Sequence, residues 1–272
     1  MSQIIDGRKL AQAKEAQLAR KVATFKDKTG ICPKLVCFLP ADNPASKIYL
    51  RLKQQACLRV GVKMEIIKLN DKAEVIKLIK QANKDEKIHG IMIQLPLPKN
   101  WPILDLIAPD KDVDCLTPVN LNLLRNGQPR FLPAVVKAIL EIIRFADYSL
   151  GSAKIAIIGQ GKLVGEPLAA YLRNIGARVL VADINTPDLA TITKQAEILV
   201  VATGQPGLIK KDMVKAGALV IDAGSPRPEV DPSVALRASF FTPVPGGVGP
   251  LNVACLLENV LIAANYVIIN HK

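Results

Sequence analysis

Three glycines between an apolar run and a helical pattern could hold a phosphate group. In KIAIIGQGKLVGEP, residues 154–167, Gly159 opens a turn, and Gly161 and Gly165 follow into a helix that begins near Leu163. Backbone N–H groups at such a helix start can bind a pyrophosphate. The spacing G-x-G-x-x-x-G is one residue longer than the strict dinucleotide fingerprint, so glycines that serve only a tight turn are the alternative.

An acidic residue lies at the expected distance beyond this turn. Asp183 ends the next apolar run, where a carboxylate would accept a hydrogen bond from the ribose 2′-hydroxyl of a dinucleotide and repel a 2′-phosphate. The alternative is a turn residue in the stretch ADINTPDL, and the two interpretations have similar weight.

Another pair of polar residues stands at helical spacing. Tyr49 and Lys53 are four residues apart, so on a helix their side chains share one face. A lysine can act as a general base near neutral pH when desolvation or a nearby positive charge lowers its pKa. Without further information, such a pair is more often an ordinary surface contact.

Other catalytic groups are scarce in the 272 residues. The two histidines, His89 and His271, are poorly placed for a Ser-His-Asp triad or a zinc site, and no metal site is predicted. Five cysteines without a C-x-x-C pair indicate neither a disulfide framework nor a zinc ribbon and favour a reducing cytoplasm. The N-terminus shows no secretory signal pattern.

The chain is basic, with 36 Lys and Arg against 24 Asp and Glu and a net charge of +12. These cations are scattered along helical faces without interleaved aromatic residues, which argues against a nucleic acid or a membrane surface as partner. Two explanations of the positive charge remain open: a solvated basic surface, and a surface that steers a polyanionic ligand toward its site. The longest apolar run, Val253 to Ile269, is interrupted by polar residues and short for a membrane span, so a packed helix is favoured.

Apolar runs and helical patterns alternate along the chain, which is typical of an α/β protein. Helices are predicted over 6–28, 45–59, 73–83, 133–146 and 250–269, and strands over 35–39, 63–69, 90–94, 154–158, 178–183, 198–202 and 219–222. Segment 95–131 is rich in proline and turns, and such segments are often functional. The two α/β series meet near residue 147, which predicts two domains with a ligand cleft between them.

Six motifs follow one another in a specific order. They are PASKIYLRLK (44–53), HGIMIQLPLP (89–98), PDKDVDCLTPVN (109–120), the glycine turn with KLVGEP, ILVVATGQPG (198–207) and TPVPGGVGP (242–250). On these motifs the chain resembles, over essentially its whole length, the methylenetetrahydrofolate dehydrogenase/methenyltetrahydrofolate cyclohydrolase family. The resemblance implies a three-layer α/β catalytic domain over 1–146, completed by the C-terminal helix 250–272, and a Rossmann-type cofactor domain over 147–249.

The resemblance implies a bifunctional enzyme that oxidises methylenetetrahydrofolate with NAD or NADP and hydrolyses the methenyl product to formyltetrahydrofolate. Lys53 would accept and donate the proton, and Gln94 would hydrogen-bond the lysine and orient its side chain. Tyr49 would stack on the folate rings. Asp114 would bind the amino-pyrimidine end of the folate, for which a carboxylate is well suited. Without the resemblance, Asp114 would be taken as a helix or turn cap.

The family pattern also implies contacts for both ligands and two partners. The substrate would also lie against Pro245, Gly246 and Gly247, in a loop whose glycines, including Gly249, permit close approach. The cofactor would contact Gly159, Gln160, Gly161, Val164, Gly165, Asp183, Ala202, Thr203 and Gly204. The resemblance further implies a homodimer formed through the cofactor domain, and the +12 charge suits folates with glutamate tails.

Several residues depart from the family pattern. Gln160 and Gly161 stand where Arg-Ser is usual, and Asp183 and Ile184 replace His-Ser, which favours NAD over NADP or weakens cofactor binding altogether. Cys115, Ala134 and Asn252 are further departures near ligand-contacting regions.

These departures leave alternative functions open. One alternative is a cyclohydrolase-only or catalytically impaired paralogue with weakened dinucleotide binding. A second is a non-enzymatic folate-binding or regulatory protein, against which the intact Lys53 argues. A third is an NAD dehydrogenase of another small substrate, which leaves KDVD and TPVPGGVGP unexplained.

Overall fold

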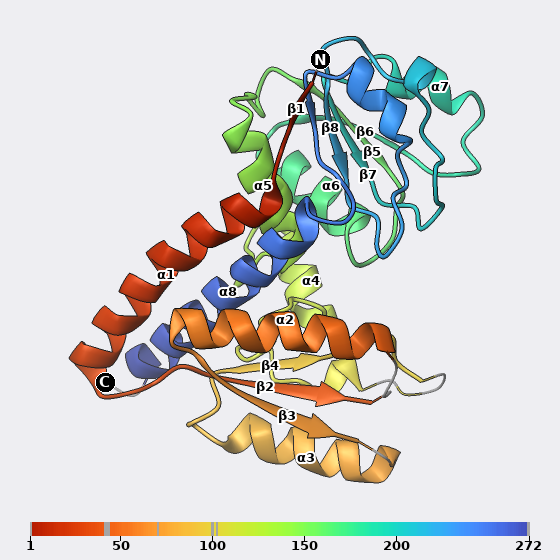
Figure 1. The fold of residues 1–272 in the computed structure, drawn as a ribbon. Coiled ribbons are helices and arrows are strands. Elements are labelled where there is room, and N and C mark those ends of the chain that lie inside the picture. The colour runs from red at the N-terminus through yellow and green to blue at the C-terminus, as the bar shows by residue number, and fades with distance from the viewer. Residues whose placement is uncertain (1, 41–43, 70, 99–100, 102, 271–272) are drawn as a thin grey trace. The chain divides into compact units, whose positions relative to one another are not determined.

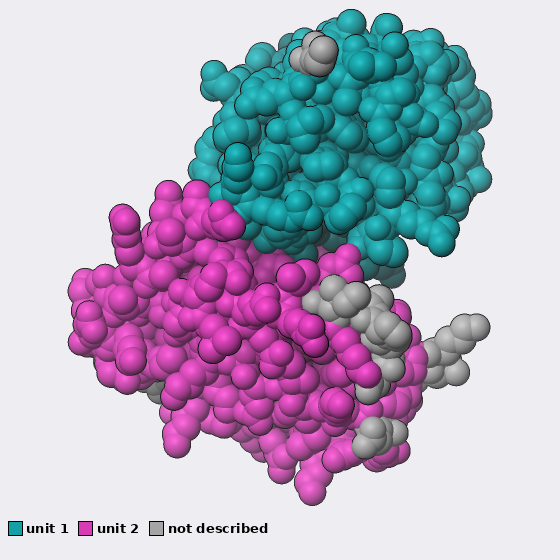
Figure 2. Space-filling view, viewed as in Figure 1, with its two compact units in different colours: residues 1–11, 124–128, 135–252 teal, residues 12–123, 129–134, 253–272 magenta. Residues whose placement is uncertain are grey.

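The structure is a computed structural model that describes residues 2–40, 44–69, 71–98, 101 and 103–270, so His271 lies outside it. The described strands form two parallel sheets covered by helices (Figure 1), which agrees with the predicted α/β class. Contacts divide the chain into two compact units (Figure 2). Unit 1 comprises 1–11, 124–128 and 135–252, and unit 2 comprises 12–123, 129–134 and 253–272.

Unit 2 contains a three-stranded parallel sheet in the order β3-β2-β4, with helices on both of its faces (Figure 1). Its elements are β2 (Lys34–Leu39), α2 (Pro44–Val60), β3 (Lys63–Lys68), α3 (Lys72–Lys84) and β4 (Gly90–Ile93). Val36 and Phe38 pack into one hydrophobic core with Val75 and Ile79 of α3. Because side chains alternate along a strand, Cys37 points to the opposite face of the sheet, the face that α2 covers.

Two long helices, α1 (Gly7–Thr29) and α8 (Val248–Asn270), also contribute to unit 2. Lys14 of α1 pairs with Glu258 of α8 at 3.1 Å. The buried carboxylate of Glu15 accepts hydrogen bonds from Arg59 of α2 at 2.6 and 2.9 Å. Helix α8 is long and apolar enough to cross a membrane, but 67% of that apolar stretch is buried within the fold, as in a core helix.

The segment predicted to be irregular, 95–131, contains two further helices. They are the short 3₁₀ helix η1 (Leu104–Leu106) and α4 (Pro118–Arg125). Helix α4 was not predicted, because its eight residues are too few to show a clear apolar period.

Unit 1 contains a six-stranded parallel sheet in the order β1-β9-β8-β7-β5-β6. The strands are β1 (Gln3–Ile4), β5 (Lys154–Ile158), β6 (Arg178–Ala182), β7 (Ile198–Val201), β8 (Leu219–Asp222) and β9 (Phe240–Phe241). The helices are α5 (Ala134–Phe145), α6 (Gly165–Asn174), α7 (Leu189–Thr193), η2 (Lys211–Met213) and η3 (Pro232–Leu236). Strand β1 pairs with β9, so the first residues of the chain join this sheet, and the unit boundaries differ from the predicted 1–146 and 147–249.

Candidate functional site

An ammonium group and an amide meet between α2 and β4 of unit 2. Lys53 Nζ donates to Gln94 Oε1 at 3.0 Å, and Gln94 Nε2 donates to the carbonyl oxygen of Leu95 at 2.9 Å. The second hydrogen bond orients the amide so that its oxygen faces the lysine. Gln94 is buried, whereas Lys53 is half-buried. The fixed amide of Gln94 therefore positions the Lys53 ammonium group, which solvent can still reach.

The helical pairing of Tyr49 and Lys53 is as predicted. Both residues lie on α2 one turn apart, and both side chains are half-buried, whereas Leu52 between them is 48% exposed. The two side chains therefore share one partly covered face of the helix.

Asp114 joins Lys53 and Gln94 from the loop that follows η1. This loop runs beside β4, where the N–H of Ile91 donates to the carbonyl oxygen of Lys111 at 2.7 Å. Burial raises the pKa of the Asp114 carboxyl above its usual range, and the nearby Lys53 ammonium partly offsets that rise. The structure thus brings a lysine, an amide and a carboxylate into one polar cluster, hereafter the Lys53 cluster.

Two neighbours of Asp114 hold this loop, and sequence reasoning missed them. The Asp112 carboxylate accepts from the N–H groups of Leu116 and Thr117 at 3.1 and 2.8 Å and from Asn120 Nδ2 at 2.9 Å. Lys111 Nζ donates to the carbonyl oxygens of Ala82, in the last turn of α3, at 3.0 Å and of Asp85, which follows the helix, at 2.7 Å. Asp112 therefore holds the loop that leads into α4. The only sequence indication of these roles is that charged residues flank the apolar Val113 on both sides in the motif KDVD.

The cysteines and the histidine near this cluster are structural. Cys115 has a φ of +58°, and its buried thiol donates to the carbonyl oxygen of Phe131 at 3.3 Å, so it fills the interior of unit 2. Burial raises the pKa of Cys37 to about 12, which leaves the thiol protonated and unreactive. His89 is buried, and its Nδ1 accepts from the N–H of Lys34 at 3.1 Å.

The glycine turn of unit 1 has the shape of a dinucleotide cradle. Gly159 has a φ of +107°, and a Cβ there would lie 2.1 Å from the carbonyl oxygen of Ala202. A Cβ on Gly165 would lie 1.8 Å from the carbonyl oxygen of Gly159. At Gly161 a Cβ would meet no described atom within 4 Å, so this glycine borders open space. Val164, before α6, donates its N–H to the carbonyl oxygen of Gly161 at 3.3 Å.

The structure brings Asp183 to this turn. Asp183 Oδ2 accepts from Gln160 Nε2 at 3.4 Å, while Oδ1 accepts from the N–H of Asn185 at 2.9 Å. One carboxylate oxygen therefore closes a turn after β6, and the other accepts a hydrogen bond from a side chain of the glycine turn.

A buried glutamate holds the loop that follows β7, and sequence reasoning missed it as well. The N–H groups of Thr203 and Gly204, two of the residues predicted to contact the cofactor, donate to Glu229 at 2.5 and 2.9 Å. The only sequence signal is an acidic residue between Pro228 and Val230, which does not identify its partner.

The predicted substrate loop belongs to unit 1. Gly246 has a φ of +110°, and Gly247 donates its N–H to the carbonyl oxygen of Pro243 at 2.8 Å. Gly7 approaches this loop so closely that a Cβ on it would lie 1.8 Å from the Gly247 oxygen. Pro245, Gly246 and Gly247 therefore belong to the same compact unit as the glycine turn.

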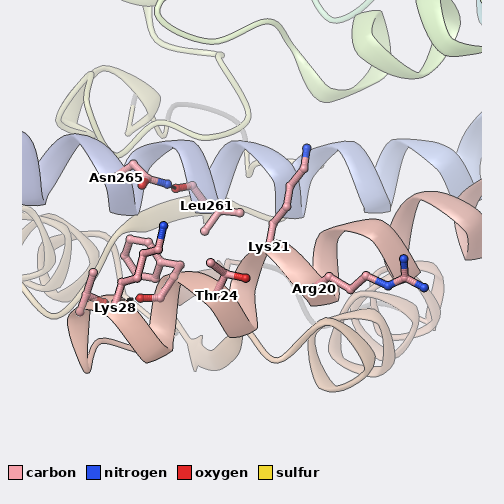
Figure 3. Close-up of a pocket in the computed structure, with 8 residues that line it drawn as sticks. Arg20, Lys21, Thr24, Lys28, Leu261 and Asn265 are labelled. Carbon is pink, nitrogen blue, oxygen red and sulfur yellow. Dashed lines mark hydrogen bonds between the residues drawn. The ribbon is translucent and has the colours of Figure 1, made fainter.

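A surface pocket of unit 2 is lined by residues that were not predicted as site residues. It is a shallow groove between α1 and α8 (Figure 3), and the cations Arg20, Lys21 and Lys28 line it together with Thr24, Phe25, Thr29, Leu261 and Asn265. No predicted site residue is among these lining residues.

Comparison with known proteins gives the family. Residues 5–114 match the profile described as the catalytic domain of tetrahydrofolate dehydrogenase/cyclohydrolase, and residues 133–268 match the profile of its NAD(P)-binding domain. The chain belongs to this family. These matches confirm the family, the two-domain α/β class and the class of enzyme predicted from the sequence.

Individual relatives cover nearly the whole chain. The chain is 43% identical to the bifunctional protein FolD of Streptococcus equi subsp. zooepidemicus, over 97% of this chain and 98% of that protein. A solved structure of the bifunctional FolD enzyme of Campylobacter jejuni superposes with a TM-score of 0.93 at 36% identity and covers 98% of this chain and 99% of its own. The structure of the Trypanosoma brucei enzyme, solved with NADP and an inhibitor, superposes with a TM-score of 0.92 at 32% identity, and the match covers 98% of each chain.

Proposed function

We propose that this protein oxidises methylenetetrahydrofolate with a nicotinamide dinucleotide and hydrolyses the methenyl product to formyltetrahydrofolate. Unit 2 binds the folate at the Lys53 cluster, and unit 1 binds the dinucleotide at the glycine cradle. The observation that carries the proposal is the Lys53–Gln94 hydrogen bond at 3.0 Å beside the Asp114 carboxyl, in a chain of this family.

The Lys53 cluster suits the hydrolytic step. Water adds its oxygen to the methenyl carbon, and Lys53 accepts the proton that the water releases. The added hydroxyl group then gives up its remaining proton and becomes the formyl carbonyl, while the bond from that carbon to one ring nitrogen breaks. This nitrogen takes up a proton, and the formyl group stays on the other nitrogen. The methenyl substrate is a cation that disfavours a second positive charge beside it, so it promotes the neutral amine that accepts the proton. Gln94 fixes the direction of the amine, and Tyr49 presents a ring face to the folate.

Asp114 binds the amino-pyrimidine through paired N–H donors. Burial raises the pKa of the Asp114 carboxyl in the folded chain above the value of about 3.9 that an aspartate has in the unfolded chain. As the pH rises above about 3.9, ionisation of this carboxyl therefore lowers the free energy of unfolding. We therefore expect Asp114→Asn to raise the melting temperature at pH 7, with the gain shrinking as the pH falls toward 4. The same change should weaken folate binding by about 10- to 100-fold, because an amide accepts at one of its two polar atoms only. Melting curves at pH 4 and 7 and a folate titration measure both effects, and lower stability at pH 7 would contradict this account.

The residues of unit 1 fit a nicotinamide dinucleotide. The open space beside Gly161 admits the pyrophosphate, and Gly159 and Gly165 keep the turn and the start of α6 close together. When bound, the dinucleotide supplies the acceptor for the hydride that leaves the methylene carbon. Asp183 accepts from the ribose hydroxyls, and the loop of Ala202, Thr203 and Gly204 borders the bound molecule.

We propose NAD as the preferred dinucleotide. The Asp183 carboxylate repels a 2′-phosphate, and its neighbour Gln160 carries no charge that would offset the repulsion. Wild-type enzyme should therefore show a higher kcat/KM with NAD than with NADP in methylenetetrahydrofolate oxidation. Asp183→Asn keeps the oxygen that accepts from Asn185 and should reduce this preference about ten-fold, or about 1.4 kcal/mol. A strong NADP preference in the wild type would refute the cofactor assignment.

A homodimer is a further part of the proposal. Strand β6 is an end strand of the six-stranded sheet, and Leu180 on it is 42% exposed. An unpaired strand edge with exposed apolar side chains can add a strand from a second copy. Sedimentation velocity should give a dimer mass, and Leu180→Lys should lower it. A monomeric wild type at micromolar concentration would exclude the dimer.

Folates with glutamate tails are the proposed natural substrates. The net charge of +12 attracts polyanions, and the groove between α1 and α8 in Figure 3 concentrates three cations on unit 2. KM should fall when a pentaglutamyl folate replaces the monoglutamyl form, and the difference should shrink at high salt. Equal KM values at low salt would contradict this assignment.

We also assign the protein to the cytoplasm. The five cysteines are free thiols, and four of them are buried, as in proteins of reducing compartments. Cell fractionation should recover the chain with cytoplasmic markers, and recovery with a membrane or secreted fraction would overturn the assignment.

A further inference from the structure

Two buried carboxylates lie behind the dinucleotide cradle of unit 1. Glu229 is 3% exposed and Asp222 is fully buried. Glu229 Oε2 accepts from the N–H and the hydroxyl of Thr203 at 2.5 and 2.7 Å, and Oε1 accepts from the N–H of Gly204 at 2.9 Å. A single side chain therefore fixes the backbone and one side chain of the loop that follows β7.

Asp222, at the end of β8, positions Glu229 in turn. Asp222 Oδ2 accepts from the N–H groups of Glu229 and Val230, both at 2.9 Å, and Oδ1 accepts from the N–H of Gly224 at 2.8 Å. The Thr242 hydroxyl accepts from the N–H of Asp222 at 2.8 Å. A chain of hydrogen bonds thus leads from β8 through Asp222 and Glu229 to Thr203 and Gly204.

The loop held by Glu229 is the wall against which the glycine turn packs. A Cβ at Gly159 would lie 2.1 Å from the Ala202 oxygen and 3.1 Å from the Thr203 nitrogen. Because these backbones are in direct contact, a shift of the loop displaces the turn that borders the pyrophosphate. The Thr203 hydroxyl also accepts from the N–H of Gln205 at 3.1 Å, so the network closes within the loop.

We infer that Glu229, held by Asp222, is a positioning residue for dinucleotide binding, acting through the loop of Thr203 and Gly204. This inference rests on the proposed dinucleotide site of unit 1. It also gives the N–H groups of Thr203 and Gly204 a defined partner, because both donate to Glu229. The charge matters because a glutamine in either orientation turns its NH₂ group toward at least one of these donors.

The test compares Glu229→Gln with wild type in two assays on the same preparation. The dissociation constant for NAD should rise ten-fold or more, with a parallel rise in its KM. The hydrolysis of methenyltetrahydrofolate, which needs no dinucleotide, should stay within two-fold of wild type and serves as the internal control. A Glu229→Gln protein that retains hydrolysis and binds NAD as wild type does overturns the inference. A wild type that binds neither NAD nor NADP instead defeats the proposed function.

A measurement on the wild type covers the case in which the variant does not fold. Amide hydrogen exchange of the apo protein should show the N–H groups of Thr203 and Gly204 already protected before NAD is added, although Gly204 is exposed. Fast exchange without NAD that slows only when NAD is added would mean that the dinucleotide, and not Glu229, accepts from these groups. That result overturns the inference.

Discussion

Replacing Lys53 by methionine is expected to lower cyclohydrolase kcat by about 10²- to 10⁴-fold, the usual contribution of a positioned general base. Methionine keeps an unbranched chain of similar length on α2 but removes the group that donates to Gln94 and accepts the proton from water. The loss should fall on kcat more than on KM, because the proton moves in the chemical step. Steady-state hydrolysis of methenyltetrahydrofolate, followed by its absorbance, gives both constants.

Two further variants make this prediction specific. Lys80→Met replaces an exposed lysine of α3 in the same unit and should leave kcat unchanged. Lys53→Arg keeps the positive charge but cannot lose its proton near neutral pH, so it should be nearly as inactive as Lys53→Met. If Lys53→Met retains wild-type kcat, or if Lys53→Arg restores it, Lys53 is not the base.

Gly165→Ala is expected to destabilise unit 1 by about 3 kcal/mol or more, at the upper end of overpacking costs. Its Cβ would lie 1.8 Å from the Gly159 carbonyl oxygen, a backbone atom that can move only if the turn between β5 and α6 opens. Urea denaturation gives the free energy of unfolding. Activity should fall together with stability.

Gly161→Ala is the matched control, since its Cβ would meet no described atom within 4 Å. It should change the free energy of unfolding by less than about 0.5 kcal/mol, as surface substitutions usually do. Its methyl group would enter the space assigned to the pyrophosphate, so NAD binding should weaken while cyclohydrolase activity stays intact. Similar stability losses in the two glycine variants would contradict this division of roles.

The strongest sequence patterns predicted the fold well. The apolar runs at 154–158 and 219–222 coincide with β5 and β8, and the periodic stretch 73–83 lies within α3. Buried strands and amphipathic helices place their apolar residues in such patterns, so these elements can be read from the chain. The two-residue strands β1 and β9 were not predicted. Gln3 pairs with Phe240 across almost the whole chain, and nothing local in either dipeptide indicates that partner.

The candidate site likewise contains residues that the sequence predicted and a residue that it did not. The motif residues Lys53, Gln94 and Asp114 were named from the sequence, and the structure brings them together. Glu229 was missed because its partners, Thr203 and Gly204, lie on another loop and become neighbours only when β7 and β8 pair. Its role depends on tertiary contacts, which spacing along the chain does not encode.

The central claim is that one chain performs both folate reactions, and one experiment on the purified wild type tests it most directly. Methenyltetrahydrofolate is supplied without dinucleotide in one sample. Methylenetetrahydrofolate is supplied with NAD in a second sample and with NADP in a third, while the absorbance of the methenyl compound and of NADH or NADPH is followed. The account predicts loss of the methenyl absorbance in the first sample and NADH formation in the second. No hydrolysis above the spontaneous rate, or no NADH or NADPH formation with either dinucleotide, would contradict it.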